Sequence, residues 1–218
     1  MLTKTNYLIL VLMSFVLSSF VAHKHTAEKE EPVYIQFGPA VSDTKWNALP
    51  AHTAGSSISA LKDQKGNTTG ISLHIVKGFN GRNKNGEKAT KTAFDMPEEV
   101  SLWAFYGNPL TAFQGKIVKE SVLKLSGLDK NKKYDFCFYG SRSDTKDNRE
   151  SSYGVKGANE VTALVNAANN STNIACAQAV QPDSAGEITI TVTAGPNNNN
   201  PYGFYYINAM KMTPIGNN

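Results

Sequence analysis

The feature that most constrains the fold is a long succession of short segments with the composition of β-strands. They follow one another at intervals of about 8 to 16 residues, separated by Gly, Asn, Asp and Pro, which favour turns. About ten such segments are found, at residues 33–38, 57–61, 70–76, 120–128, 134–140, 151–157, 160–167, 173–180, 187–195 and 203–213. This rhythm is typical of antiparallel β-sandwiches rather than of βαβ units, whose strands alternate with helices.

Segment 187–195, EITITVTAG, shows the strand pattern most clearly. Ile188, Ile190 and Val192 alternate with threonines, which places the apolar side chains on one face of a strand and the hydroxyls on the other. One face would then lie in the core and the other in water. We therefore predict an all-β chain, an antiparallel β-sandwich of about nine to ten strands with one short helix.

Residues 95–107, DMPEEVSLWAFYG, have the features of that helix. Asp95 is placed to cap it, Pro97 is tolerated in a first turn, and Glu98 stands three residues after the cap. Helical spacing puts Trp103 on the face of the apolar residues, which favours a core position for it over a ligand platform.

A corner of the sandwich is predicted around residues 125–134. Leu125 and Leu128 flank a glycine, a polar turn follows, and Tyr134 begins the next apolar segment. In several kinds of β-sandwich such a tyrosine closes the corner, because its hydroxyl hydrogen-bonds back to the loop backbone.

The beginning of the chain predicts export. Residues 1–22 combine an early lysine, an apolar run and small residues before a cleavage point after Ala22, the pattern of a signal peptide. An uncleaved anchor is the alternative; after cleavage we expect no stable membrane span. Residues 23–32 are charged and without apolar periodicity, as in a flexible spacer, and 33–214 would form a single sandwich domain. Charged residues make up only 18 % of the chain, which suits a secreted, periplasmic or cell-surface β protein.

The two cysteines, Cys137 and Cys176, each fall inside a strand-like segment. In an oxidising compartment, two cysteines on neighbouring strands would form a disulfide. Two buried free thiols that act as small hydrophobic groups are the alternative, and spacing alone does not decide between them.

Several stretches together resemble a known module: IQFGP, WNAL, LKDQKGNTTGISLHI, LSGLDKNKKYDFCFYGSR, DNRESSYGVKG and FYYINAMKM. They are similar to galactose-binding-like, jelly-roll β-sandwich modules found with polysaccharide-processing enzymes in secreted proteins of Bacteroidetes-type bacteria. The resemblance extends from about Val33 to Met212. It implies a jelly-roll sandwich and a role in polysaccharide utilisation.

The polar loop at 140–152 is the principal candidate for a ligand site, since a sandwich gathers its binding residues in the loops at its ends. The planar forks of Arg142 and Arg149 can hold a carboxylate, a sulfate or two neighbouring hydroxyls. Asp144 and Asn148 can bond to sugar hydroxyls.

Tyr153 completes the predicted site, where its ring would stack on a sugar face. The alternative for Arg149 is structural: Asp147, Glu150 or backbone carbonyls would hold it and so fix the hairpin. A structural calcium ion bound by Asp144 and Asp147 is a further alternative, although the spacing of an EF-hand is lacking.

Two other loops have less specific features. Residues 79–88, FNGRNKNGEK, contribute Arg82 and many turn-forming residues, which more often indicate a plain surface loop than a binding face. Residues 195–201, GPNNNNP, have the composition of a mobile turn between the last strands.

No motif for catalysis, a cofactor or nucleic-acid binding is found. The histidines are scattered, G-x-S-x-G and H-E-x-x-H are absent, and the lysines are interspersed with acidic residues at a net charge of only +4. We therefore expect a carbohydrate-binding protein that captures a polysaccharide or oligosaccharide, with no cofactor apart from the calcium alternative. A small lyase or hydrolase, or a structural protein that packs against cell-envelope partners, are the other interpretations.

Overall fold

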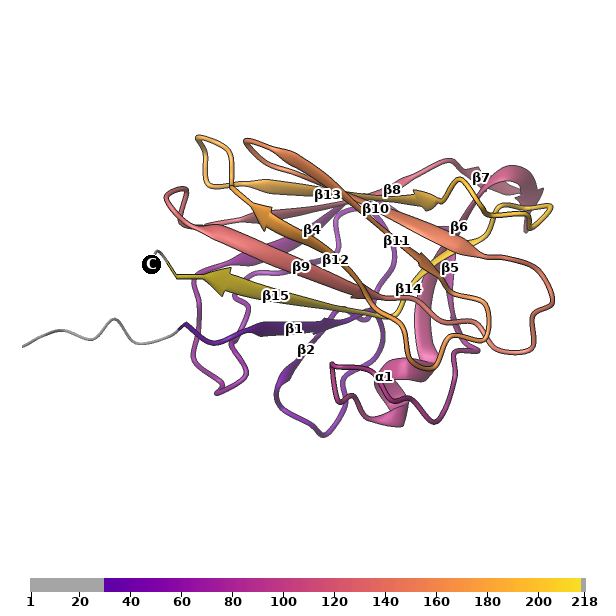
Figure 1. Ribbon diagram of the computed structural model, residues 1–218, viewed down its shortest axis with the longest axis horizontal. Coiled ribbons are helices and arrows are strands. Elements are labelled where there is room, and N and C mark those ends of the chain that lie inside the picture. The colour runs from indigo at the N-terminus through magenta and orange to yellow at the C-terminus, as the bar shows by residue number, and fades with distance from the viewer. Residues whose placement is uncertain (1–29, 217–218) are drawn as a thin grey trace, which may run out of the picture.

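Two large sheets face each other and enclose the core, and a smaller sheet closes one end, at the right in Figure 1. The computed structural model describes residues 30–216. The predicted signal peptide at 1–22 and most of the spacer at 23–32 lie outside these residues. No helix in the described range is long and apolar enough to cross a membrane.

The five-stranded sheet contains, in order across it, β12 (Ala175–Val180), β9 (Lys133–Tyr139), β15 (Ala209–Ile215), β1 (Val33–Gln36) and β2 (Trp46–Ala48). The six-stranded sheet contains β11 (Glu160–Asn166), β10 (Glu150–Lys156), β13 (Ile188–Ala194), β8 (Ser121–Ser126), β4 (Ser72–Lys77) and β3 (Ser57–Ile58). The small sheet contains β14 (Tyr205–Ile207), β6 (Trp103–Phe113) and β5 (Gly81–Lys84), with β7 (Lys116–Val118) paired to β6. Apart from the parallel pair β1 and β2, the described strand pairs are antiparallel.

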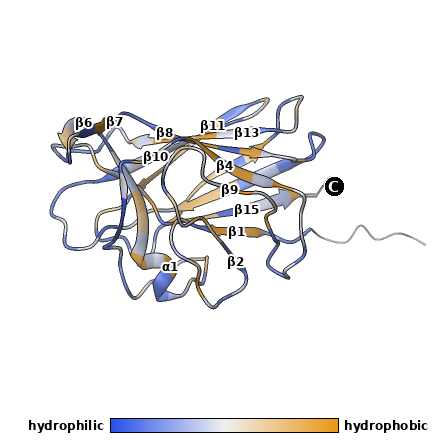
Figure 2. Ribbon diagram, turned by 180° about the vertical axis from the view of Figure 1, so that it is seen from behind, coloured by the Kyte–Doolittle hydropathy of each residue, from blue (hydrophilic) through white to orange (hydrophobic). Residues whose placement is uncertain are grey.

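The predicted β-sandwich is confirmed, and the predicted strand segments all contain strands. Along β13, Ile188, Ile190 and Val192 are fully buried, while the threonines between them are half-buried. Phe136 and Phe138 of β9 meet them from the facing sheet as parts of the same core cluster. Figure 2 shows the matching division along the chain, with hydrophobic residues concentrated in the strands and hydrophilic ones in the loops.

A second apolar layer covers the outer face of the five-stranded sheet. Because successive strand residues point to opposite faces, Ile35 enters the main core, whereas Tyr34 points outward. There the ring of Tyr34 packs against Trp46 and Phe94, with centroid separations of 5.2 and 6.3 Å. Burial on both faces explains why Val33, Tyr34 and Ile35 of β1 are apolar without alternation.

The helix prediction at 95–107 was only partly correct. The helix α1 occupies Glu98–Leu102 without a side-chain cap, and Asp95 adopts a positive φ of 46° instead of capping it. Trp103 then begins the long strand β6 and is half-buried. Its ring lies 5.6 Å from the guanidinium carbon of Arg82, so it is not a residue of the main core as predicted.

The corner and the disulfide both agree with the sequence prediction. The hydroxyl of Tyr134 accepts a hydrogen bond from the backbone N–H of Asp129 at 3.1 Å. Cys137 and Cys176 lie opposite each other on β9 and β12 and form a disulfide. Such a bridge persists in oxidising compartments, which points to a secreted or extracellular protein.

Candidate functional site

The small sheet and the loops beside it form a groove of about 380 Å³ at one end of the sandwich. Its aromatic lining consists of Tyr106, Phe113, Phe204 and Tyr206. Its polar lining consists of Arg82, Asn83, Asn85, Gln114, Arg142 and Arg149. Aromatic surface with a few converging polar groups is the usual composition of a small-ligand site, and the volume lies in the ordinary range of ~300–1,000 Å³.

The aromatic residues of the groove support one another. Phe113 contacts Tyr106 and Phe204 edge to face, with ring centroids 6.1 and 5.0 Å apart. Tyr202 stacks on Phe204 at 5.2 Å. Tyr106 and Phe204 are buried, whereas Phe113 is only half-buried, so part of its ring is accessible in the groove.

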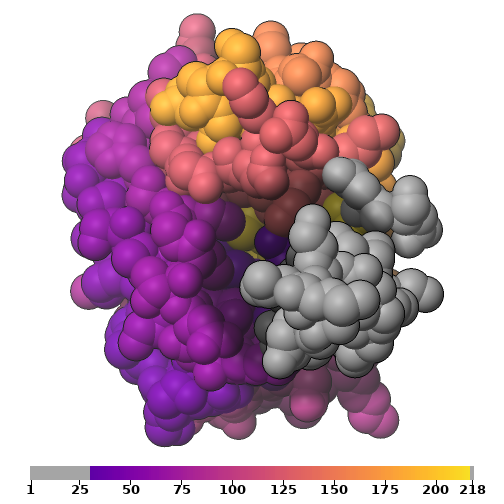
Figure 3. Space-filling view, turned by 90° about the vertical axis from the view of Figure 1, so that its left-hand side faces the viewer, coloured from indigo at the N-terminus to yellow at the C-terminus, as the bar shows by residue number. Residues whose placement is uncertain are grey.

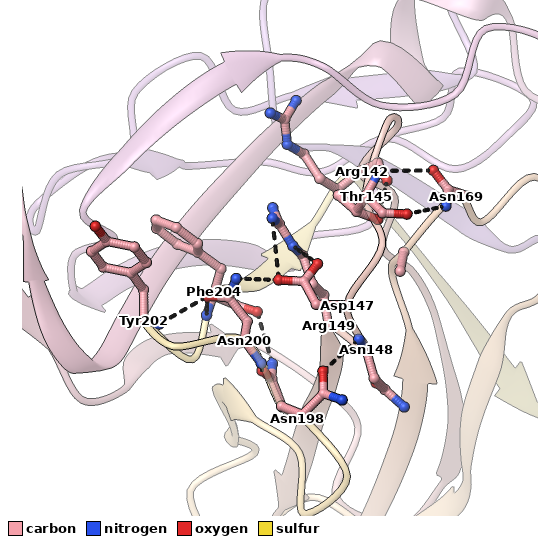
Figure 4. Close-up of polar contacts among 12 residues, drawn as sticks. Arg142, Thr145, Asp147, Asn148, Arg149, Asn169, Asn198, Asn200, Tyr202 and Phe204 are labelled. Carbon is pink, nitrogen blue, oxygen red and sulfur yellow. Dashed lines mark hydrogen bonds and ion pairs between the residues drawn. The ribbon is translucent and has the colours of Figure 1, made fainter.

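Arg149 lies in this groove, but its guanidinium is held by the protein itself. Its Nε donates to Oδ1 of Asp147 at 2.9 Å, and its Nη1 donates to the hydroxyl of Tyr206 at 2.7 Å. The guanidinium carbon also lies 5.7 Å from the ring centroid of Phe204 (Figure 4). The structural alternative considered for Arg149 is therefore the one observed, with Asp147 as its partner.

The pKa shifts of Asp147 and Tyr206 agree with a structural role for Arg149. Burial raises the pKa of Asp147, but hydrogen bonds from Asn200 and Arg149 outweigh it and hold the pKa below its ordinary value. Burial raises the pKa of Tyr206 despite the nearby guanidinium. At neutral pH the groove thus contains a neutral phenol beside an ion pair.

The asparagine run at 195–201 is hydrogen-bonded to the loop at 140–152. Asn200 donates to Asp147 (Figure 4). Asn198 donates to the carbonyl oxygens of Glu150 and Phe204 at 2.9 and 2.8 Å. Asn197 and Asn199 also make side-chain bonds to residues 148–150. Each of the four asparagines therefore has a defined structural bond, which composition alone did not indicate.

Arg142 is the predicted residue whose charge stays available to a ligand. Its side chain extends away from Thr145 and Asn169, the pair that anchors its loop (Figure 4). Its Nη1 lies 3.4 Å from the carbonyl oxygen of Asn85, and the better orientation of the Asn85 amide puts the side-chain oxygen at 2.9 Å. Within residues 30–216 it forms no ion pair with a carboxylate.

The other predicted site residues lie outside the groove lining. Tyr153 is fully buried, stacks on Phe138 at 4.3 Å and donates to the carbonyl oxygen of Tyr206. The prediction that its ring stacks on a sugar was wrong, because alternation along β10 turns it into the core. Asn148 shapes the loop, since its Oδ1 accepts from the backbone N–H of Glu150. The remaining residue, Asp144, is exposed and outside the lining.

The aromatic lining was not predicted. Arg82 is a lining residue from β5, but its side chain shares the face of Phe105, opposite Tyr106. There its Nη1 donates to the carbonyl oxygen of Pro50, and its guanidinium carbon lies 5.6 Å from the ring of Trp103. Phe204 and Tyr206 alternate with Tyr205 and Ile207, so both faces of this segment are apolar. A strand with apolar residues on both faces must be covered by other residues on each face. This pattern in the sequence could have indicated a second aromatic cluster.

A cavity of similar size, about 400 Å³, lies at the opposite end of the sandwich. Figure 3 shows a hollow at this end, with indigo and yellow atoms at the bottom of the hollow. Both of its lysines pair with carboxylates: Lys65 with Glu31 at 2.6 Å, and Lys132 with Glu30 and Asp129. Asp63 accepts hydrogen bonds from Asn67. No cluster of three or more metal-ligating side chains occurs in the part of the chain that the structure describes.

Comparison with known proteins does not assign a family. No model of a protein family matches the sequence, and no curated protein aligns with it at a significant level. Among solved structures, the chain is similar to the ANXUR1 extracellular domain from Arabidopsis thaliana, with a TM-score of 0.42 and 11 % identity. The match covers 77 % of this chain and 54 % of the other, so the chain spans about half the length of that structure.

Proposed function

We propose that the protein is a secreted or cell-surface carbohydrate-binding protein that captures polysaccharide in the groove of the small sheet. The observation that carries this proposal is the composition of the groove, in which accessible aromatic surface lies beside amide and guanidinium groups. Sugar rings have apolar C–H faces that pack on aromatic rings, and hydroxyls at their edges that bond to amides and guanidinium groups.

The rigidity of the groove supports binding. Its loops are fixed by the Asp147–Arg149 ion pair and by the asparagine run, before any ligand arrives. A site that is already ordered loses less conformational entropy on binding. The described ends of the chain, at residues 30 and 216, both lie at the end opposite the small sheet (Figure 1). Attachment through either end would therefore leave the groove accessible.

The resemblance of the sequence to modules of polysaccharide-processing proteins adds the biological setting. It suggests that the protein serves polysaccharide utilisation in a Bacteroidetes-type bacterium, at the cell surface, in the periplasm or in the medium. Cell-envelope partners would belong to this setting. A structural calcium ion remains part of the proposal to be tested, because some extracellular modules bind calcium through carbonyl and carboxylate oxygens.

A glycan array probed with the secreted protein, with and without calcium, tests the proposal. We expect binding to a defined set of polysaccharides, and we expect Phe113→Ala to reduce it about tenfold without lowering the melting temperature by more than a few degrees. Leu110→Ala is the matched control, since Leu110 is 63 % exposed on the same hairpin and does not line the groove.

Two outcomes would reject the proposal. Absence of binding to every glycan, in both calcium conditions, would favour the structural or adhesive interpretation. Release of new reducing or unsaturated ends from a bound polysaccharide would assign the protein to the small lyases or hydrolases instead.

A further inference from the structure

The distribution of arginine in this chain is uneven. Of the 22 basic residues only three are arginines, Arg82, Arg142 and Arg149, and all three line the groove. No lysine of the described residues lines it. Arginine and lysine supply equal charge, but only the planar guanidinium offers two parallel N–H groups to a carboxylate or sulfate. The segments that line the groove carry all the arginines of the chain.

The three guanidinium groups do not have the same role. Arg149 is compensated by Asp147 and bonded to Tyr206. The guanidinium of Arg82 lies on the other face of the small sheet, against Pro50 and Trp103. Arg142 forms no ion pair in residues 30–216, and its side chain donates to oxygens of Asn85. Because a guanidinium has five N–H donors, Arg142 retains donors for a ligand.

No aspartate or glutamate is found among the described residues that line the groove. Asp147 lies behind the lining, and its charge is matched by Arg149. The positive charge of Arg142 therefore has no carboxylate partner in the groove lining. A neutral ligand would partly desolvate this charge without pairing it, whereas an anionic group would form charge-assisted hydrogen bonds with it.

We propose that the groove selects acidic saccharides, and that an oxyanion of the sugar, a carboxylate or a sulfate ester, binds to Arg142. The sugar ring then lies against the accessible part of Phe113, and Gln114 reaches its hydroxyls. Arg149 is a positioning residue that holds the loop and Tyr206 in place. This inference rests on the proposed carbohydrate-binding function and adds the charge of its ligand.

Matched pairs of polymers test the inference: polygalacturonate against its methyl ester, and dextran sulfate against dextran. We expect at least one charged polymer to bind more tightly than its neutral partner, by about tenfold or more. The polygalacturonate arm reports a carboxylate and the dextran sulfate arm a sulfate. Higher salt should weaken the preferred interaction.

Three variants separate specific recognition from general ionic attraction. Arg142→Gln should lose most of the preference for the charged polymer, and Arg142→Lys, which keeps the charge but not the fork, should lose a large part of it. Lys146→Gln removes one positive charge from an exposed residue of the same loop and should bind like the parent. Melting temperatures identify any misfolded variant. If Arg142→Gln is misfolded, the binding of Arg142→Lys is compared with that of the parent instead.

Three results would overturn the inference. Equal binding of each charged polymer and its neutral partner would refute the acidic preference but leave carbohydrate binding intact. Equal weakening by Lys146→Gln and Arg142→Gln would reduce the effect to general ionic attraction. Absence of binding to all four polymers and to the glycan array would reject both the inference and the proposed function.

Discussion

The two ends of the sandwich have cavities of nearly equal volume, about 380 and 400 Å³, but they differ in how their charges are arranged. At the end where the described chain begins and finishes, lysines and carboxylates pair within the cavity lining. At the other end, Arg142 lines the groove together with aromatic residues and has no carboxylate partner in the described residues. Volume therefore does not distinguish the two ends, and it is the unpaired charge beside apolar surface that favours the small-sheet end as the proposed binding site.

The largest expected effect concerns the sheet that both ends share. The disulfide joins β9 and β12 and closes a segment of 39 residues, so Cys137→Ser should lower the free energy of unfolding by about 2 to 5 kcal/mol. Chemical denaturation of parent and variant measures it. A change of less than about 1 kcal/mol would mean that the disulfide contributes little to the free energy of unfolding. The stability of each end would then depend on the contacts of that end alone.

The next effect distinguishes the two ends directly. Asp147→Ala removes the carboxylate that holds Arg149, whose side chain is only 15 % exposed. Loss of this charge-assisted pair should cost about 1 to 3 kcal/mol of unfolding free energy, and Arg149→Ala should cost a similar amount. A double-mutant cycle gives the coupling between them. Additive losses would show that the ion pair does not hold the loop.

A smaller effect depends on pH. Because the folded-state pKa of Asp147 is lowered, its contribution is fully present above the ordinary pKa of the carboxyl and is lost as the pH falls through the folded-state value. Between about pH 5 and pH 2 the parent should therefore lose more stability than Asp147→Asn, which has no group to titrate there. Parallel pH profiles for the two proteins would contradict this.

The smallest effect is expected at the opposite end. Lys132→Ala breaks contacts with Glu30 and Asp129, whose carboxylate side chains are 50 % and 43 % exposed. Exposed ion pairs contribute less than about 1 kcal/mol, so the denaturation midpoint should barely move. A loss as large as that of Asp147→Ala would remove the energetic difference between the two ends.

Much of the fold could be predicted because it depends on local patterns. Alternation placed Ile188, Ile190 and Val192 in the core, and the spacing around Tyr134 predicted the corner. The helix predicted at 95–107 extended too far, because β6 begins at Trp103 and includes Gly107. A Cβ at this position would lie 2.1 Å from the ring of Tyr205.

The site was predictable only in part, because it is assembled from four distant segments. The loop at 140–152 could be recognised as a candidate from its own composition, and Arg142 does line the groove. Its neighbours Arg82, Phe113 and Phe204 come from β5, β6 and the segment before β14, and no local pattern indicates that these meet. Tyr153 was assigned to the wrong face of its strand. The sequence of β10 does not show which alternate residues point into the core, and a shift of one residue exchanges the two faces.

The most direct test of the central claim uses the fact that the chain has only three arginines. Their side-chain Nε–H signals can be resolved by NMR and assigned with three single Arg→Lys variants. On addition of an oligogalacturonate or a sulfated oligosaccharide, the signal of Arg142 should shift more than that of Arg82, whose guanidinium lies on the other face of the small sheet. The backbone amides of Asn67 and Gly127, at the opposite cavity, should not shift. Shifts confined to Asn67 and Gly127, or unchanged arginine signals with a glycan that binds, would contradict the account.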